Sequence, residues 1–145
     1  VAGDLFTCAI DNNGVDCWGD NGYSQTVGVP TNLVNPLLIS AGHYNACTID
    51  ENGLHCWGDV YGQAEVPKNL VNPIAVSAGI YHTCAIDDNG IHCWGDNDYG
   101  MNEVPSGLVN PVAVSSGGWH TCVLDNKGVH CWGNTRTDGA MYPRL

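Results

Sequence analysis

Hydrophobic and polar residues alternate along the chain in short segments separated by turns, and no stretch has helical periodicity. Residues 81–87 (YHTCAID) and 90–96 (GIHCWGD) flank an Asx-Gly turn, which predicts a β-hairpin. The apolar run NPIAVSAG (residues 72–79) begins next to a proline and predicts an inner strand. The loop NDYGMNEVPSGLV that follows the hairpin predicts one weak outer strand at residues 102–105.

This pattern occurs four times. The first cysteines of successive hairpins, at positions 8, 47, 84 and 122, are 39, 37 and 38 residues apart. Such a period is typical of solenoids and propellers, and three or four short strands per unit favour a propeller. We therefore expect an all-β, propeller-like array that forms a single repeat domain, residues 1–145, with units at about 1–40, 41–77, 78–115 and 116–145.

The cysteines occur in pairs whose members are always nine positions apart, and none is left over. An even number at fixed spacing predicts a disulfide framework and an oxidising compartment, either extracellular or periplasmic. Zinc is the alternative, but the short knuckles of most zinc sites are absent from the sequence. The predicted disulfides, each stapling one repeat, are Cys8–Cys17, Cys47–Cys56, Cys84–Cys93 and Cys122–Cys131.

Two hairpin registers are compatible with the turn chemistry. A two-residue turn at Asp88-Asn89 pairs Asp87 with Gly90 and places Cys84 opposite Cys93, within bridging reach. A type I turn with a glycine bulge shifts the pairing by one residue and turns the two sulfurs to opposite faces. Because the cysteine spacing suits only the first register, we expect that one.

The pattern SAGIYHTCAIDDNGIHCWGDNDYG, together with YGQ at residues 61–63, resembles the regulator of chromosome condensation repeat. It is most similar to the cysteine-bearing form in secreted bacterial proteins, and the likeness covers nearly the whole chain. The resemblance implies a β-propeller. Eukaryotic members of the family act as nucleotide exchange factors or chromatin binders, and some bacterial ones inhibit β-lactamases. Those roles rest on loops and basic patches that this sequence does not show.

The ends of the chain depart from the family pattern, in which about seven blades are usual. Only three inner segments are complete, at residues 33–40, 70–77 and 108–115. The first unit begins at Val1-Ala2-Gly3, after the expected inner strand, and the last ends in NTRTDGAMYPRL without that run. The absence of an initiator Met and a signal peptide indicates a mature or excised chain. Either the tail AMYPRL folds back beside Val1, or the last unit meets the first unit of another molecule.

The strongly negative net charge of the chain argues against some classes of binding partner. The chain carries 15 Asp+Glu against 4 Lys+Arg, and residues 1–115 contain thirteen acids and a single base, Lys68. Nucleic-acid binding depends on basic side chains that neutralise phosphates, so this composition argues against DNA or RNA. No apolar run approaches the roughly 18 residues that a membrane helix requires, so we expect no membrane insertion.

Histidines recur at fixed positions, which leaves two interpretations open. They could form a ring of imidazoles around a metal, or they could be repeat positions that pair across strands. Phe6 and Asp16 replace histidine in the first unit, which breaks a symmetric site and favours the second interpretation. The turns DNNG, DENG, DDNG and DNKG similarly suit local backbone hydrogen bonds better than a calcium loop. We predict no metal and no cofactor.

Two groups of aromatic residues also follow the repeat. A tryptophan follows the second cysteine of every unit and is expected to pack between neighbouring blades. A tyrosine lies in the loop after WGD in three units, close to acidic residues, and either packs over the loop glycine or forms a ligand surface. The candidate binding residues are Tyr23, Tyr61, Tyr99, Asp20, Asp59 and Asp96.

No Ser/His/Asp arrangement, phosphate loop or pair of catalytic carboxylates stands out above the repeat, so no catalytic residue and no enzyme activity is predicted. The sequence favours a non-enzymatic, secreted β-propeller module that acts by protein–protein contact or as a structural subunit, with self-association. The alternative is a lectin-like or inhibitor-like module that binds a glycan or an enzyme through the Tyr/Asp loops.

Overall fold

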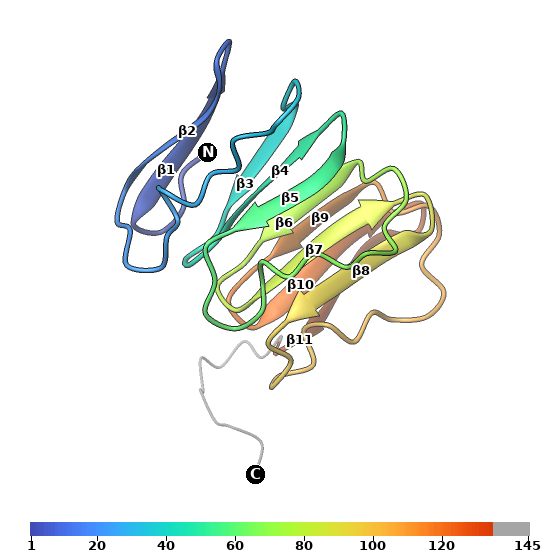
Figure 1. Ribbon diagram of the computed structural model, residues 1–145. Helices are drawn as coiled ribbons and strands as arrows, with labels where there is room; N and C mark the ends of the chain where they lie inside the picture. Colours follow the sequence, from blue (N-terminus) through green and yellow to red (C-terminus); the bar gives the residue numbers. More distant parts are fainter. Residues whose placement is uncertain (135–145) are drawn as a thin grey trace.

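Every regular element of the computed structural model is a strand, over residues 1–134, the part of the chain that the structure describes (Figure 1). Alternating apolar residues bounded by glycine and Asx turns explain these short strands. They are β1 Phe6–Asp11, β2 Gly14–Gly19, β3 Leu38–Ala41, β4 Ala46–Asp50, β5 Gly53–Trp57, β6 Ala75–Ala78, β7 His82–Asp87, β8 Gly90–Gly95, β9 Ala113–Ser116, β10 His120–Asp125 and β11 Gly128–Gly133.

The strands form four antiparallel sheets, which we call blades 1 to 4. Blade 1 contains β1-β2, and blades 2, 3 and 4 contain β3-β4-β5, β6-β7-β8 and β9-β10-β11. Asp87 pairs with Gly90 and Cys84 with Cys93, so the expected hairpin register is confirmed and the bulged register is wrong. All four predicted disulfides form within their own hairpins, with 4.1 Å between the two Cα atoms of each.

The inner strands are shorter than the apolar runs that predicted them. In the run at residues 33–40, the strand begins only at Leu38. Asn35 has a φ of 48° and precedes Pro36, so the backbone turns there before it joins the sheet. The same left-handed asparagine precedes β6 and β9, at Asn72 and Asn110. The first five of the eight residues in each such run therefore form a loop that leads into the sheet.

The weak outer strand expected at residues 102–105 is absent, and this prediction was wrong. The loop bonds to itself instead: the amide of Glu103 donates to the Gly100 carbonyl and that of Val104 to the Asn102 carbonyl. The side chain of Asn102 donates to the carbonyls of Gly95 and Asp96. Pro105 has no amide proton to offer a neighbouring strand. Each complete blade is therefore three-stranded.

The first blade retains the end of an inner strand, which the repeat pattern had placed before residue 1. Ala2 pairs with Thr7 as an isolated bridge. The terminal amine of Val1 donates to the Cys8 carbonyl, and the Cys8 amide donates to the Val1 carbonyl. Val1 and Ala2 thus occupy the places that Ser40 and Ala41 hold in blade 2. The tail AMYPRL, expected to fold back beside them, lies outside the described residues.

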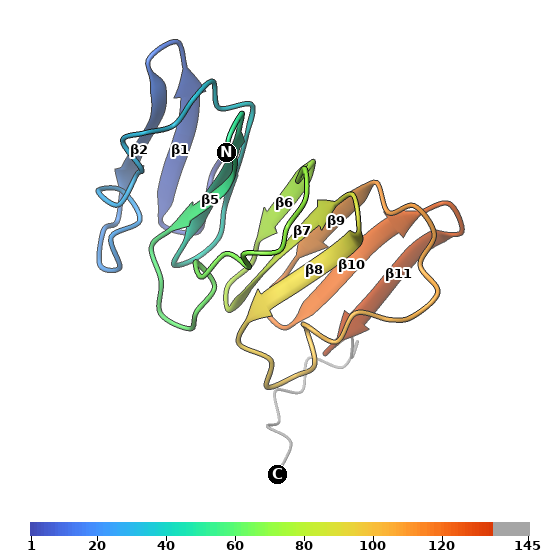
Figure 2. The ribbon, with the colours of Figure 1, turned by 45° about the vertical axis from the view of Figure 1, so that its right-hand side comes forward.

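Consecutive blades stack face to face, in chain order from blade 1 to blade 4 (Figures 1 and 2). The face that carries the disulfide, here called the forward face, packs against the rear face of the next blade. Between blades 2 and 3, for example, Cys47 and Ile49 of the forward face contact Val76, Ala85 and Trp94. Equivalent clusters join blades 1 and 2 and blades 3 and 4. The hydrophobic core is therefore divided among three interfaces between blades.

A tryptophan closes each of these interfaces. Trp57, Trp94 and Trp132 are buried, and each Nε1–H donates to a backbone carbonyl in the loop that precedes its blade. The acceptors are the carbonyls of Gln25, Gln63 and Met101, at 2.8, 2.9 and 2.7 Å. The expected packing role is thus found in blades 2 to 4. Trp18 of blade 1 differs, since it is 55% exposed.

The acidic turns and the adjacent histidines have a local structural role. The Asp87 carboxylate accepts the amides of Val71 and Asn89 and lies 3.0 Å from His92 Nε2. Burial of this carboxyl opposes ionisation, but these hydrogen bonds outweigh it and lower its pKa. Blades 2 and 4 repeat the arrangement, with Asp50 beside His55 and Asp125 beside His130. Each such aspartate ties the hairpin turn to the segment leading into the inner strand.

Buried polar side chains also cross the interfaces. His82 Nε2 lies 2.7 Å from Thr121 Oγ1 of the next blade, and Asn45, at the equivalent position of blade 2, donates to Thr83 Oγ1 at 2.9 Å. Burial lowers the pKa of His82 to about 4, and the nearby His120 adds to this shift. His82 is therefore neutral at physiological pH, and its ring fills a place where a neutral amide also fits.

This position yields a pH prediction. The unfolded chain binds a proton at His82 near pH 6.5, whereas the folded chain does so only near pH 4. The contribution of His82 to stability is therefore complete above pH 6.5 and is lost as the pH falls toward 4, by at most about 3 kcal/mol. His82→Asn, which introduces the residue that blade 2 carries at this position, should flatten this decline in denaturant unfolding at pH 7, 5.5 and 4. Parallel stability curves for the two proteins would contradict the assignment.

A second prediction concerns the disulfides. Non-reducing peptide mapping should find no free thiol among the eight cysteines, and every bridge within its own hairpin. Each bridge closes a loop of about ten residues, worth roughly 2.5–3 kcal/mol in the chain-entropy picture. Full reduction should therefore lower the melting temperature sharply. Bridges between different blades, or a melting temperature unchanged by reduction, would contradict the stapled-blade description.

Candidate functional site

One end of the blade array gathers the aromatic residues that the core does not use. The turns from inner to middle strands lie at this end, together with the loops that leave the outer strands. The amides of Asp20 and Asp96, which begin two of these loops, donate to the carbonyls of Leu5 and Tyr81 in the turns. We call this end the belt face, and the opposite end, which carries the β-hairpin turns, the hairpin face.

Six aromatic rings form a continuous row across the belt face, which we call the aromatic belt. Tyr44, Tyr81 and Trp119 come from equivalent turns of blades 2, 3 and 4, with ring centroids 6.4 and 5.7 Å apart. Each also meets a tyrosine from the loop before its own blade. These contacts are Tyr23 with Tyr44 at 4.8 Å, Tyr61 with Tyr81 at 5.1 Å and Tyr99 with Trp119 at 5.9 Å.

The belt is open to solvent. Tyr23 and Tyr61 are 44% and 45% exposed, and the other four rings are partly buried. Partial burial and the neighbouring tyrosines raise the pKa of Tyr44. Its phenol is therefore a neutral hydroxyl at physiological pH and offers both a donor and an acceptor. Such a row combines apolar area with polar tips, which is the chemistry of many protein-binding surfaces.

Buried glutamine side chains hold the loops that carry Tyr23 and Tyr61 in place through hydrogen bonds. Gln63 is buried; its side-chain oxygen accepts the Tyr61 amide at 2.6 Å, and its amide group donates to the Ile80 carbonyl. The backbone carbonyl of Gln63 accepts both the Trp94 indole and the Thr83 hydroxyl. The interface between blades therefore fixes the conformation of the exposed loop. Gln25 holds Tyr23 by the same type of bond.

The three candidate aspartates lie in these loops, but their carboxylates are engaged locally. Asp59 accepts the amides of Tyr61 and Gln63, and Asp96 accepts the amide of Asp98. Asp20 accepts the amide of Gly22 and the side chain of Gln25. They shape the loops and also place negative charge beside the belt. Asp4 adds to this charge, and its carboxylate forms a hydrogen bond with His43 Nδ1.

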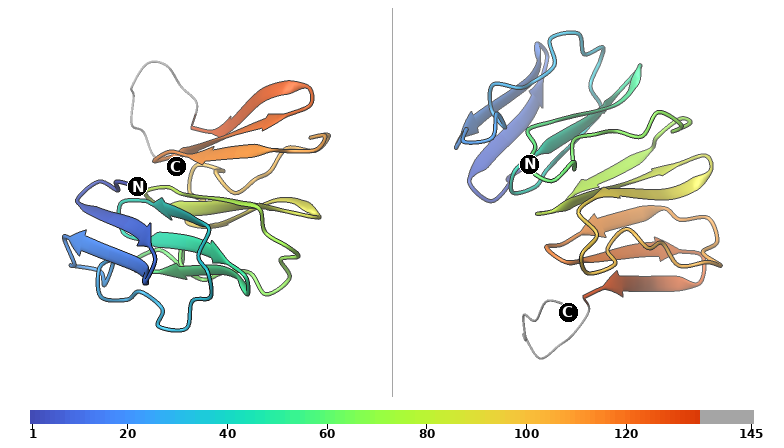
Figure 3. Two further views of the ribbon diagram at one scale, coloured as in Figure 1. Left: turned by 90° about the horizontal axis from the view of Figure 1, so that it is seen from above. Right: turned by 60° about the horizontal axis from the view of Figure 1, so that its bottom comes forward.

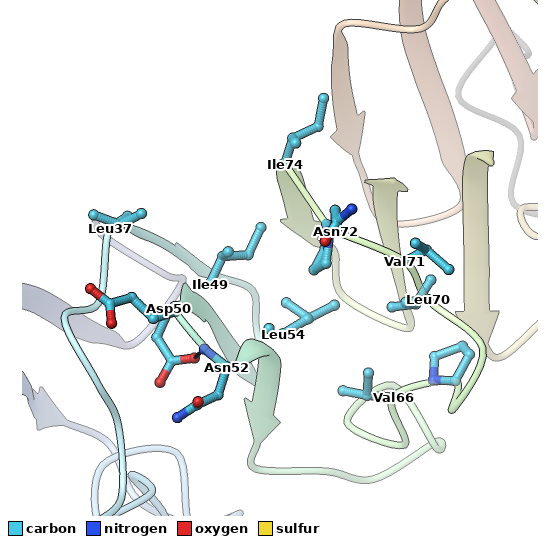
Figure 4. Close-up of a pocket in the computed structure, with 14 residues that line it drawn as sticks. Leu37, Ile49, Asp50, Asn52, Leu54, Val66, Leu70, Val71, Asn72 and Ile74 are labelled. Atoms are coloured by element: carbon cyan, nitrogen blue, oxygen red, sulfur yellow. Dashed lines mark hydrogen bonds between the residues drawn. The ribbon is translucent and has the colours of Figure 1, made fainter. Parts of the chain in front are cut away.

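Two hollows accompany these features. On the belt face, a cavity of about 360 Å³ lies where all four blades converge, lined by the glycine turns at Gly3, Gly42, Gly79 and Gly117. On the hairpin face, a groove of about 640 Å³ separates blade 2 from the segment before β6. Figure 4 shows Asp50 and Asn52 on one side of this groove and Leu70, Val71 and Asn72 on the other. Only the first hollow adjoins the belt.

The structure thus brings the three candidate tyrosines onto one surface but does not bring their aspartates together as a separate site. Sequence reasoning did not identify Tyr44, Tyr81 and Trp119, which complete the belt. Their signal was an aromatic residue three positions before the first cysteine of units 2 to 4, where unit 1 has Leu5. Among residues 1–134, no cluster of His, Cys, Asp or Glu is arranged to hold a metal ion. No helix within those residues has the length and apolar character of a membrane span.

The model of the regulator of chromosome condensation (RCC1) repeat matches residues 1–25, 74–100 and 112–139, which is more than half of the chain. No curated protein sequence matches the chain.

Several solved structures are similar to the whole array. The ectodomain of the receptor kinase CR4 from Physcomitrella patens has a TM-score of 0.74 at 28% identity, over 94% of this chain and 40% of that one. The CRINKLY WD40 ectodomain of ACR4 from Arabidopsis thaliana has a TM-score of 0.70 at 28% identity, over 92% and 48%. Prp20p from Saccharomyces cerevisiae, described with its binding properties to Gsp1p and histones, has a TM-score of 0.73 at 19% identity, over 93% and 42%.

The chain therefore spans less than half the length of these structures. The likeness to Prp20p concerns the fold alone. Together with the four blade-like sheets, these similarities confirm the predicted propeller-type, all-β architecture.

Proposed function

The chain belongs to the family of regulator of chromosome condensation (RCC1) repeat proteins, and from this premise we propose that it is a non-enzymatic module that binds a protein partner through its aromatic belt. A propeller-type fold of this family suggests a protein-interaction module. The observation that carries the proposal is the continuous row of six partly exposed rings. Tyrosine and tryptophan are enriched among the residues that dominate binding energy at protein interfaces.

The charge around the belt favours a basic partner. Asp4, Asp20, Asp59 and Asp98 lie on or beside the belt loops and are exposed. The only lysine or arginine residues among residues 1–134 are Lys68, in the segment before β6, and Lys127, in the hairpin turn of blade 4. A guanidinium or ammonium group seated on a tyrosine ring beside a carboxylate gains from both charge and cation–π attraction. Lysine- and arginine-rich segments are therefore the expected ligands, and nucleic acid is not.

The lectin-like and inhibitor-like alternatives would use the same tyrosine loops. Asp59 and Asp96 already accept backbone amides, which leaves fewer carboxylate oxygens for sugar hydroxyls. This favours a protein over a glycan. The four disulfides support a place outside the reducing cytosol, in the extracellular space or the periplasm. The same proposal treats residues 1–145 as one repeat domain, since the interfaces between blades run without interruption through the array.

Binding to immobilised peptides tests this function. We expect arginine- and lysine-rich peptides to bind, acidic and neutral peptides of equal length to bind more weakly, and added salt to weaken the binding. Tyr61→Ala and Tyr99→Ala should each reduce affinity about tenfold or more, because aromatic anchors carry much of the energy of an interface. Thermal unfolding should change little, since neither ring belongs to a buried cluster.

Leu37→Ala provides the matched control, because Leu37 is 75% exposed and lies on the hairpin face. It should bind like the unaltered protein. Equal binding by the tyrosine variants would contradict the belt as the contact surface. Unfolding of both tyrosine variants would show that the rings are packing residues. Tyrosine-dependent binding on a glycan array, without peptide binding, would favour the lectin-like alternative instead.

A further inference from the structure

No segment within residues 1–134 covers the forward face of blade 4, although the equivalent faces of the other blades are buried. Leu124 corresponds to Ile49 and Ile86, which are 7% and 1% exposed, yet Leu124 itself is 43% exposed. Val129 on the neighbouring strand is 71% exposed, and Cys131 of the disulfide is exposed as well. A contiguous exposed apolar face of this kind is typical of an interaction surface. In blades 1 to 3, the surface that buries it is the rear face of another blade.

The rear face of blade 1 is exposed as well. Trp18 is 55% exposed, whereas the tryptophans at its position in the other blades are 5–8% exposed. Those three indoles rest on the forward face of the preceding blade. Trp18 therefore lacks a forward face to pack against, and blade 4 offers one. Figures 2 and 3 show blades 1 and 4 at opposite ends of the array.

Hydrogen bonds between neighbouring blades also leave an acceptor on blade 4 and a donor on blade 1 without a partner within residues 1–134. Ser40 Oγ accepts the Ala78 amide of the next blade at 2.9 Å, and Ser77 Oγ accepts the Ser116 amide at 2.8 Å. On blade 4, the equivalent Ser115 is exposed and accepts no such bond within residues 1–134. The corresponding donor on blade 1 is the amide of Ala2.

A second series of hydrogen bonds joins the glycine turns of neighbouring blades. In this series the earlier blade donates and the following blade accepts, the reverse of the serine bonds. The amides of Asp4, His43 and Ile80 donate to the carbonyls of Gly42, Gly79 and Gly117, each in the following blade. Within residues 1–134, no bond of this kind involves the Gly118 amide on blade 4 or the Gly3 carbonyl on blade 1. The two terminal faces thus complement each other in apolar surface and in hydrogen-bond donors and acceptors.

We propose that the forward face of blade 4 binds the rear face of blade 1 in a second copy of this chain, so that two copies close a head-to-tail ring of eight blades. Contacts between unlike faces produce closed rings when the rotation allows it. Eight blades lie within the usual range of about four to eight, whereas three copies would exceed it.

Light scattering on the 145-residue chain tests this arrangement over a concentration series. We expect a mass of twice 15.4 kDa that falls to 15.4 kDa on dilution. Leu124→Glu and Trp18→Glu each place a charge in the proposed contact and should weaken association by about a hundredfold or more. Leu37→Glu, at a position that is 75% exposed and lies on the hairpin face, should leave the dimer intact. Circular dichroism should show that all three variants are folded.

Mixing the Leu124→Glu and Trp18→Glu variants tests whether the two faces bind each other. Each copy then retains one intact face, so Leu124→Glu and Trp18→Glu chains together should regain a dimer joined by a single contact. In the isolated Leu124→Glu chain, the exposed Cys122–Cys131 bridge should be reduced faster than in the dimer. A monomer at every concentration would overturn the proposal, as would association that Trp18→Glu leaves unchanged.

Discussion

The structure depends on one repeated contact, in which a tryptophan of one blade packs on the disulfide-bearing face of the blade before it. A sheet of three strands with four to six residues each cannot bury its two apolar faces by itself. Stacking solves this, because Cys47 and Ile49 are covered by Trp94 and Ala85 of the next blade. The bridge inside each hairpin joins its two strands on that face, and the contact recurs between each pair of consecutive blades.

The same contact connects the core to the functional surface. The carbonyl of Gln63 that receives the Trp94 indole belongs to the loop that presents Tyr61. Packing energy gained between blades therefore also fixes the position of an exposed ring. Residues that make the contact are nearly constant from unit to unit, whereas the turn residue of the belt changes from Leu5 to Tyr44, Tyr81 and Trp119. This division allows the surface to vary without loss of the fold.

Much of this architecture could be predicted from the sequence, because its determinants are local. The nine-residue spacing of the cysteines selected the hairpin register, since only one pairing brings Cys84 opposite Cys93. The outer strand at residues 102–105 was predicted wrongly, because the side chain of Asn102 bonds back to Gly95 and Asp96 and the loop closes on itself. Only three of the six rings of the aromatic belt, Tyr23, Tyr61 and Tyr99, were predicted from the sequence. Tyr61 stood out beside Asp59, but its contact with Tyr81 joins a loop to a turn of the following blade, and the spacing of residues along the chain does not reveal that contact.

Hydrogen exchange at the tryptophan indoles tests the blade contact most directly. Nuclear magnetic resonance resolves each Nε1–H, and single Trp→Phe variants assign the signals. We predict that the indoles of Trp57, Trp94 and Trp132 exchange only through global unfolding, because each is buried and bonded to the preceding loop. Trp119, whose Nε1 makes no hydrogen bond within residues 1–134, should exchange quickly and serve as the internal reference. Exchange of the three buried indoles as fast as that of Trp119 would contradict the account.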